Sequence, residues 1–179
     1  DADPNDWGLQ KDKNLWESAK LNTPELVLQW IQEKIQELVG EGKSIIFSGS
    51  PRTIYEAEGE IPLLEELYEK KDVKVFNIEL SEAESIKRNS KRRICKGNRH
   101  PIPNFPEFDG ITKCPKDGSE IITRLLDNPE TIKVRFQEYI NRTLPIIDFL
   151  KKRDYKIMEI NGEQPIENVF EDILDKLND

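Results

Sequence analysis

Apolar and polar positions along the chain predict helices that alternate with short strands. Helical spacing of apolar residues, with turn residues at the ends, indicates helices at 23–40, around 62–70, 81–93, 128–153 and 165–177. Short apolar runs predict strands at 44–47, 73–80 and 155–160. Strands that alternate with helices are typical of a parallel sheet covered on both sides, so we predict an α/β fold.

Capping residues support several of these boundaries. Thr23 stands directly before a proline, which suits the start of a helix. Ser81 and Glu84 have the spacing of a capping box, in which each side chain bonds the other residue's main chain. Because proline has no N–H to donate, we expect Pro145 to kink the helix at 128–153.

Prolines and glycines gather between residues 94 and 120 and interrupt the alternation. We expect this stretch to be an insertion with short strands of its own, outside the core. The three predicted strands make a small sheet, which a further strand–helix–strand unit upstream of Asp1 would complete. Residue 1 is not methionine, so either the start was removed by processing or this is the downstream part of a longer chain. Together with the small sheet, this leads us to expect a chain truncated at its N-terminus.

Composition narrows the range of functions. The 179 residues carry 27 basic and 35 acidic side chains, a net charge of −8, which argues against a nucleic-acid-binding coat. No apolar run approaches the roughly 20 residues that cross a bilayer. Two cysteines do not make a disulfide framework, so we expect a cytoplasmic protein. From the charge and the short apolar runs, we expect it to bind neither nucleic acid nor membrane.

Arginines are concentrated in one part of this acidic chain. Seven of the nine lie between Arg88 and Arg142, and Arg52 directly follows a predicted strand. The planar guanidinium group donates two parallel hydrogen bonds to a phosphate and keeps its charge, so the cluster predicts an anion site. The alternative is a solvated basic face paired with the many acidic residues.

Several segments resemble motifs of the adenylate kinase family, in family order and over nearly the whole chain. The strongest are SGSPRT at 48–53, similar to D-G-F-P-R-T, and RNSKRRIC at 88–95, similar to R-x-x-x-R-R-x-C. RLLD at 124–127 resembles R-x-D-D, and residues 130–139 carry the E-T, R and Y that follow it in the family. Weaker matches stand at 20–27, 143–149 and 161–165.

The resemblance implies a fold and a domain organisation. The fold is a P-loop NTPase-like parallel sheet flanked by helices, with a small β-rich lid as the insertion. Residues 1–93 then form a core that includes part of the AMP-binding region at about 1–40. Residues 94–123 form the lid, and residues 124–179 complete the core with the C-terminal helices and strand.

The resemblance also implies an activity. Family members transfer the γ-phosphoryl group of ATP reversibly to AMP, giving two ADP, with Mg²⁺ bound to ATP. We therefore expect ATP, AMP and ADP as partners, a role in adenine nucleotide homeostasis and a monomeric state. Such a transfer requires positioning of the phosphates, neutralisation of their charge and exclusion of water.

Matching positions give the expected site residues. The catalytic arginines implied by the resemblance are Arg92, Arg124 and Arg135. The ATP-binding residues are Arg88, Arg92 and Gln164, the last through its main-chain carbonyl. The AMP-binding residues are Lys20, Asn22, Val27, Gly49, Arg52, Glu56, Arg124 and Arg135. Asp127 is expected to orient the arginines by pairing with them.

The sequence departs from the family pattern at several points. The 179 residues contain no G-x-x-x-x-G-K phosphate-binding loop, so we expect the chain alone to lack kinase activity. Ser48 replaces the aspartate that orders Mg²⁺ through water, Leu126 replaces one lid-exit aspartate, and Glu56 replaces the glutamine that reads the AMP base. Two alternatives follow: a nucleoside monophosphate kinase of altered base preference, or a non-catalytic nucleotide-binding module.

The insertion carries candidate metal ligands. Many lids of the family bind zinc through C-x-x-C pairs, and the corresponding positions here are Cys95, Asn98, Cys114 and Asp117. Asparagine is a poor zinc ligand, but His100 is close enough in sequence to replace it. The sequence leaves three alternatives: a zinc site of Cys95, His100, Cys114 and Asp117, a metal-free lid held by hydrogen bonds, or a disulfide.

Overall fold

A computed structural model of the protein describes residues 7–18, 20–102, 108–123 and 127–178. Its contacts divide the chain into two compact units. The first unit comprises Asp1–Glu79 and Gln137–Asp179, and the second comprises Leu80–Phe136. The second unit contains the whole insertion that the sequence predicts at 94–120.

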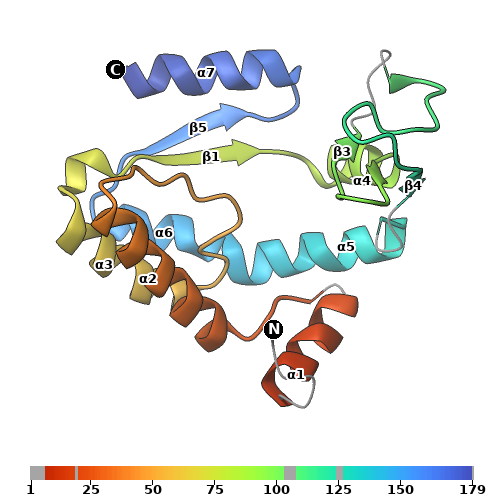
Figure 1. Ribbon diagram of the computed structural model, residues 1–179. Helices are drawn as coiled ribbons and strands as arrows, with labels where there is room; N and C mark the ends of the chain where they lie inside the picture. The colour runs from red at the N-terminus through yellow and green to blue at the C-terminus, as the bar shows by residue number, and fades with distance from the viewer. Residues whose placement is uncertain (1–6, 19, 103–107, 124–126, 179) are drawn as a thin grey trace. The chain divides into compact units, whose positions relative to one another are not determined.

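A parallel pair of strands forms the centre of the first unit. Strand β1 (Val75–Glu79) pairs with β5 (Ile157–Asn161), with Val75 opposite Ile157. Helices α6 (Pro145–Lys152) and α7 (Ile166–Asn178) flank the pair on opposite sides (Figure 1). The structure thus confirms the predicted α/β fold, and the strands at 73–80 and 155–160 are confirmed with slightly shorter bounds.

The hydrophobic core of the first unit lies between the sheet and two further helices. These are α2 (Pro24–Gly40), as predicted, and α3 (Ile54–Leu67), which a short 3₁₀ turn, η1 (Lys70–Asp72), separates from β1. The buried members of this core are Ile35, Ala57, Ile61, Leu64, Ile146, Leu150 and Tyr155. Helix α1 (Trp7–Glu17) was not predicted, because its segment is polar and lacks a clear apolar period.

Helix α3 begins well before the predicted start at 62. The Thr53 hydroxyl accepts a hydrogen bond from the Glu56 N–H at 3.2 Å and caps the helix. Pro62 therefore lies inside the helix, and the prediction that it opens the helix was wrong. At Thr23, the residue preceding α2, the side chain makes no capping bond; its N–H instead donates to Asp12 Oδ1 at 2.5 Å.

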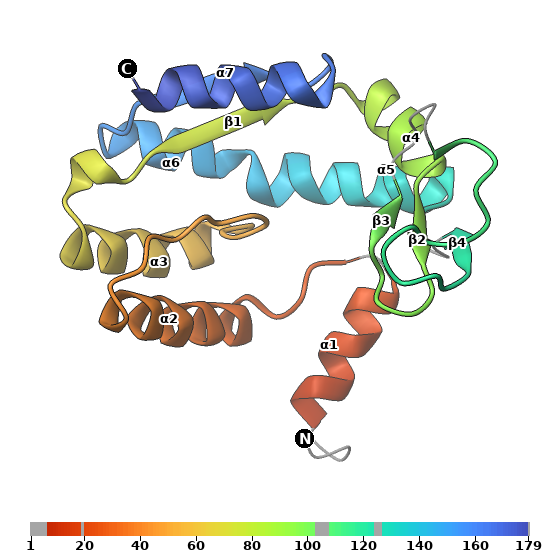
Figure 2. The same cartoon turned by 45° about the horizontal axis from the view of Figure 1, so that its top comes forward.

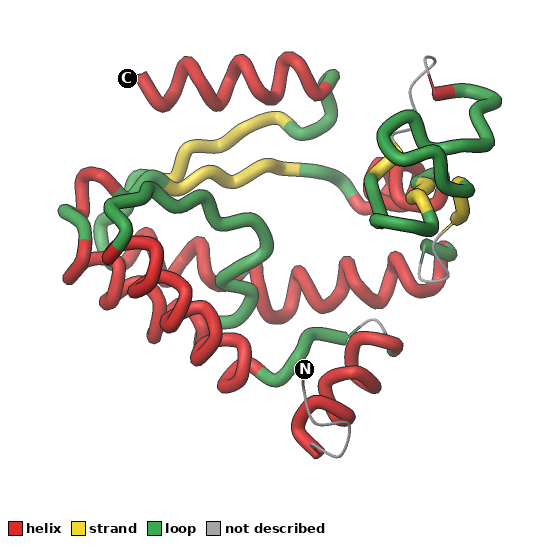
Figure 3. The backbone as a smooth tube through the Cα atoms, in the orientation of Figure 1, coloured by secondary structure: helices red, strands yellow, loops and turns green. Residues whose placement is uncertain are grey.

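The predicted strand at 44–47 was also wrong. These residues are extended, but they pair with no strand in the part of the chain that the structure describes (Figure 3). Ile45 and Phe47 pack against the core, whereas Ile46 between them is 95% exposed. The apolar run is therefore explained by burial of one side of an extended segment, without the ladder hydrogen bonds that define a strand.

The long helix predicted at 128–153 is interrupted. It consists of α5 (Pro129–Glu138), a π-helical turn η3 (Tyr139–Thr143) and α6. Within this turn the Leu144 N–H donates to the Tyr139 carbonyl at 2.8 Å. The wide turn directly precedes Pro145, whose ring nitrogen cannot donate. The hydrogen-bond pattern therefore changes just before this proline, and the expected kink stays a prediction.

The second unit combines a capped helix with a small antiparallel sheet (Figure 2). Helix α4 (Glu82–Ser90) begins after Ser81, whose hydroxyl accepts from the Glu84 N–H at 3.3 Å, as the capping-box spacing predicts. Strand β2 (Arg93–Cys95) pairs with β3 (Pro101–Ile102) on one side and β4 (Ile121–Thr123) on the other. The insertion therefore has strands of its own, as expected.

Among the described residues, no helix is both long and apolar enough to cross a membrane.

Candidate functional site

Arg52 lies in a tightly constrained segment between the extended residues 44–47 and helix α3. Gly49 has φ +96°, and a Cβ atom there would lie 2.6 Å from Arg52 Nη2, so the guanidinium group lies against the glycine main chain. The main chain of Arg52 is bound on both sides. Its N–H donates to Glu56 Oε2 at 2.8 Å, and its carbonyl accepts from the Thr143 hydroxyl at 2.8 Å.

Glu56 faces the interior of the first unit and is 2% exposed. Besides the bond from the Arg52 N–H, its carboxylate accepts from the Thr53 hydroxyl at 2.9 Å. Both carboxylate oxygens therefore accept hydrogen bonds from residues directly before helix α3. That Glu56 reads the AMP base stays a prediction.

A second buried carboxyl group in this region was not predicted from the sequence. Glu60, one helical turn after Glu56, is fully buried, and its Oε1 accepts from the Ser50 hydroxyl at 2.7 Å. Burial raises the pKa of Glu60 to about 7; the Ser50 hydrogen bond lowers it and the charge of Glu56 raises it. Ser50 and Glu60 line a cavity of about 260 Å³. The available signal was Ser50 itself, which stands where the family motif has phenylalanine.

The other expected AMP-binding residues surround the start of α2. Lys20 and Asn22 precede the helix and Val27 lies in its first turns. Lys20 is exposed, while Asn22 and Val27 are half-buried. Their role in binding AMP stays a prediction.

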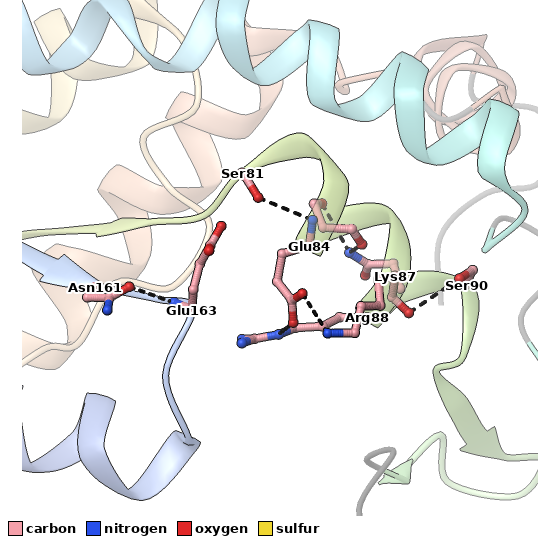
Figure 4. Close-up of polar contacts among 9 residues, drawn as sticks. Ser81, Glu84, Lys87, Arg88, Ser90, Asn161 and Glu163 are labelled. Atoms are coloured by element: carbon pink, nitrogen blue, oxygen red, sulfur yellow. Dashed lines mark hydrogen bonds and ion pairs between the residues drawn. The ribbon is translucent and has the colours of Figure 1, made fainter.

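Residues expected to contact ATP lie in both units, and Figure 4 draws the polar contacts around Arg88 and those of Asn161 and Glu163. In the second unit, Glu84 accepts from Arg88 Nε at 2.7 Å and from Lys87 Nζ at 2.9 Å. These bonds, first that from Lys87 and then that from Arg88, lower the pKa of Glu84. In the first unit, the Glu163 N–H donates to Asn161 Oδ1 at 2.9 Å, just before Gln164.

Gln164 is tied to helix α7 by its side chain. Its Nε2 donates to Asp172 Oδ2 at 2.5 Å. This bond holds the loop after β5. Because Gln164 is predicted to bind ATP through its main-chain carbonyl, that contact does not require a free side chain.

Arg92 and Asp127 form a two-pronged ion pair within the second unit. Arg92 Nε donates to Asp127 Oδ2 at 2.9 Å, and Nη2 donates to Oδ1 at 2.7 Å. The Asp127 side chain is fully buried, whereas that of Arg92 is 30% exposed. The paired carboxylate therefore fixes the guanidinium plane, and the expected pairing of Asp127 with an arginine is confirmed for Arg92.

The two remaining catalytic candidates differ in what the structure shows. Arg135 lies on α5 and is exposed. Arg124, together with Leu126, falls outside the described residues. The roles of both arginines stay predictions.

Four potential metal ligands converge in the second unit. One ligand atom each of Cys95, His100, Cys114 and Asp117 lies within 4.8 Å of all the others. His100 Nδ1 is 3.5 Å from each Sγ and 3.3 Å from Asp117 Oδ2, and Cys95 Sγ is 3.3 Å from the same oxygen. Both thiols are free, so the predicted alternative of a disulfide is not what the structure contains.

Asn98 contributes to this cluster from outside. Its Nδ2 donates to Asp117 Oδ2 at 2.8 Å, and Ser119 donates to Oδ1 through its hydroxyl at 2.7 Å and its N–H at 3.0 Å. These bonds, first those from Ser119 and then that from Asn98, hold the pKa of Asp117 well below its usual range. The carboxylate is thus oriented and kept charged.

No protein-family model matches the chain. Individual proteins do, along most of its length. The chain is 36% identical to an adenylate kinase of Elusimicrobium minutum over 169 residues, 93% of this chain and 76% of that protein. It is 33% identical to an adenylate kinase of Desulfitobacterium hafniense over 170 residues, with the same coverage. Identity to the Bacillus subtilis adenylate kinase is 32% over 168 residues, 92% of this chain and 75% of that protein. Together with the α/β core, the arginine set and the inserted sheet, these similarities show that the chain belongs to the adenylate kinase family.

Proposed function

We propose that this protein is an ATP:AMP phosphotransferase, which converts ATP and AMP reversibly into two ADP. The observation that carries the proposal is the similarity to proteins named adenylate kinase over about 93% of the chain. The alternatives of a changed base preference or a non-catalytic module are not favoured by these relatives.

The described side chains suit the charge that phosphoryl transfer develops. Little covalent chemistry is required, so catalysis rests on positioned phosphates and on cations that neutralise their oxygens. Arg52 would hold the AMP phosphate, because its main chain and side chain are both fixed. Arg92 would stabilise the transferring group, while Arg88 and the Gln164 carbonyl would bind ATP. Arg124 and Arg135 would complete the set.

Adenylate kinases use Mg²⁺ with ATP. Magnesium takes most of its ligands from substrate phosphates and water, so a protein needs few contacts to it. Ser48 is exposed at the start of the Arg52 segment and offers a hydroxyl that can bond a water on the ion. When bound, Mg²⁺ neutralises phosphate charge, and Ser48 would orient it without adding a charge of its own.

We further propose that residues 94–123 act as the lid, that residues 1–93 and 124–179 form the core, and that the protein is a cytoplasmic monomer. The antiparallel sheet β3–β2–β4 supports the lid assignment, because it gives the insertion a hydrogen-bonded framework of its own. Its small core of Cys95, Ile102 and Cys114 lies entirely within these residues.

The AMP assignment can be tested on the chain as it stands. Arg52→Ala is expected to weaken AMP binding by about tenfold or more, because it removes charge-assisted hydrogen bonds to the phosphate. Adenosine, which has no phosphate, is expected to bind both proteins equally. Calorimetric titration measures both affinities, with Lys151→Ala, an exposed cation on α6, as the charge-matched control. Equal loss for AMP and adenosine would contradict the assignment.

The ligand cluster fits a zinc ion. A tetrahedral zinc with bonds of about 2.0–2.3 Å separates its ligands by about 3.3–3.8 Å. The distances of 3.3–3.5 Å among the Cys95, His100 and Asp117 atoms lie in that range. We propose that Cys95, His100, Cys114 and Asp117 hold one zinc, which would cross-link β2 to the loop before β4.

Elemental analysis tests the zinc site. The protein purified without chelator is expected to contain about one zinc per chain, and His100→Ala is expected to lose most of it. Asn98→Ala serves as the matched variant, since the Asn98 side chain bonds to Asp117 without being one of the four proposed ligands; this variant should retain the metal with weaker affinity. Zinc that remains stoichiometric in His100→Ala would remove His100 from the ligand set, and no zinc in either protein would favour the metal-free lid.

A further inference from the structure

The segment that carries Arg52 is anchored by side chains that the proposed function leaves without a role. Ser50 donates to Glu60, and Thr143 donates to the Arg52 carbonyl. Together with the Arg52 N–H bond to Glu56, these contacts attach the segment to α3 and η3. Hydrogen bonds that involve neighbouring residues therefore fix the position of Arg52.

Glu60 is an unfavourable residue to bury at this place. It is fully buried beside the apolar Ile61 and Leu64, and Oε2 has no hydrogen-bond partner among the described residues. A carboxyl group in such surroundings lowers stability unless it is fully bonded, and an aliphatic side chain would pack there without this penalty. Among the described residues, the Glu60 side chain bonds only to Ser50, which points to the Arg52 segment as the reason for the carboxyl group.

The Ser50 bond acts on the part of the segment that supports the guanidinium group. Ser50 is adjacent to Gly49, whose main chain lies against Arg52 Nη2. Rotation or displacement of residue 50 moves the Gly49 peptide and so removes the surface on which the guanidinium rests. In the family motif this position is phenylalanine, which has no hydroxyl group to donate such a bond.

We propose that Glu60 is a positioning residue: through Ser50 it holds the Gly49 main chain and thereby orients Arg52 toward the AMP phosphate. The proposal rests on the proposed function of Arg52. In this proposal Ser50 and Glu60 act through Arg52, so they are expected to affect binding of the AMP phosphate and to leave binding of the nucleoside part unchanged.

The charge state of Glu60 modulates this contact. A carboxylate accepts a stronger hydrogen bond than a neutral acid or amide, and the pKa of Glu60 lies near 7 because of burial. The titratable and charged groups that face it are Glu56 on the same helix, and Tyr139 of η3 and Lys74 before β1 across the cavity. Arg52 is therefore held more firmly at pH 8 than at pH 6.

Calorimetric titration of the chain with AMP and with adenosine tests the proposal. Ser50→Ala and Glu60→Leu are expected to weaken AMP binding about fivefold while adenosine binding stays unchanged. Glu60→Gln, whose amide oxygen still accepts from Ser50, is expected to restore most of the AMP affinity. Glu58→Gln is the matched control, because Glu58 is exposed on the same helix and is expected to change neither affinity.

The pH dependence gives a second readout. The AMP phosphate itself titrates near pH 6, so the affinity of the unmodified protein is compared with that of Glu60→Gln at each pH. The ratio is expected to be close to one at pH 6 and about two- to threefold in favour of Glu60 at pH 8. A ratio of affinities that does not change with pH would show that the charge of Glu60 does not affect AMP binding.

The outcomes separate this inference from the proposed function. Folded Ser50→Ala and Glu60→Leu proteins that bind AMP as tightly as the unmodified chain would overturn the inference, while a loss in Arg52→Ala would keep the AMP site. Normal AMP binding by Arg52→Ala would overturn the proposed role of Arg52 itself. If Glu60→Leu does not fold, Ser50→Ala decides the question, because it removes only a hydroxyl group.

Discussion

Replacing Arg92 by alanine is expected to lower kcat for phosphoryl transfer about a hundredfold or more in a form of the protein that includes a phosphate-binding loop. The guanidinium group is fixed by the buried Asp127 carboxylate and is 30% exposed, so it keeps donors for a phosphate while its orientation is set. Positive charge held in place before the reaction stabilises the transition state without reorganisation. Steady-state kinetics with ATP and AMP measure the change.

Neighbouring variants separate catalysis from stability. Lys91→Ala removes an adjacent exposed cation and is expected to leave kcat unchanged. Asp127→Asn keeps the shape of the partner and is expected to lower kcat less than Arg92→Ala, because one of the two bonds to Arg92 is weakened. A sharp fall in melting temperature for Arg92→Ala, with a normal kcat of the folded protein, would make the pair purely structural.

Raising the pH from 5 to 8 is expected to lower the free energy of unfolding through Glu60. Its pKa rises from 4.5 to about 7 in the folded protein, chiefly because of burial. Between these values the folded state keeps a proton that the unfolded chain has lost, so the stabilisation present below pH 4.5 is lost as the pH rises through 7. We expect a contribution of about 2 kcal/mol, less than the full shift implies, because the adjoining cavity can admit water.

Urea unfolding at several pH values measures this contribution. Glu60→Leu is expected to raise the free energy of unfolding by about 1–2 kcal/mol at pH 8 and to have a smaller effect at pH 5. Glu58→Leu, at an exposed position of the same helix, is the control for the changed helix composition. The same pH dependence in Glu60→Leu and in the unmodified protein would show that another group causes it.

The elements that the sequence predicted well are those set by local chemistry. Strands β1 and β5 follow from short apolar runs, and α4 follows from the capping box of Ser81 and Glu84. Helix α3 carries an equivalent signal in Thr53 and Glu56, but Pro62 gave a competing start that the structure does not use. The extended segment 44–47 shows the limit of such patterns, because pairing depends on a neighbour that local sequence does not specify.

In the candidate site, too, some features could be predicted from the sequence and others could not. The convergence of Cys95, His100, Cys114 and Asp117 was predicted from the family resemblance and from histidine being a better zinc ligand than asparagine, and the resemblance also implied the pairing of Asp127 with an arginine. The bond between Ser50 and Glu60 was not predicted, because it depends on which side of α3 faces the preceding loop. In sequence Glu60 is one of several glutamates in an acidic stretch, and only the folded chain distinguishes it as buried.

Transfer of a phosphoryl group from ATP to AMP can be followed directly by ³¹P NMR of a form of the protein that includes a phosphate-binding loop, mixed with ATP, AMP and Mg²⁺. The account predicts that the ATP and AMP signals fall together and that two ADP appear for each AMP consumed, with no inorganic phosphate, because water is excluded as an acceptor. Consumption of ATP with AMP unchanged, or release of inorganic phosphate in place of the second ADP, would contradict it.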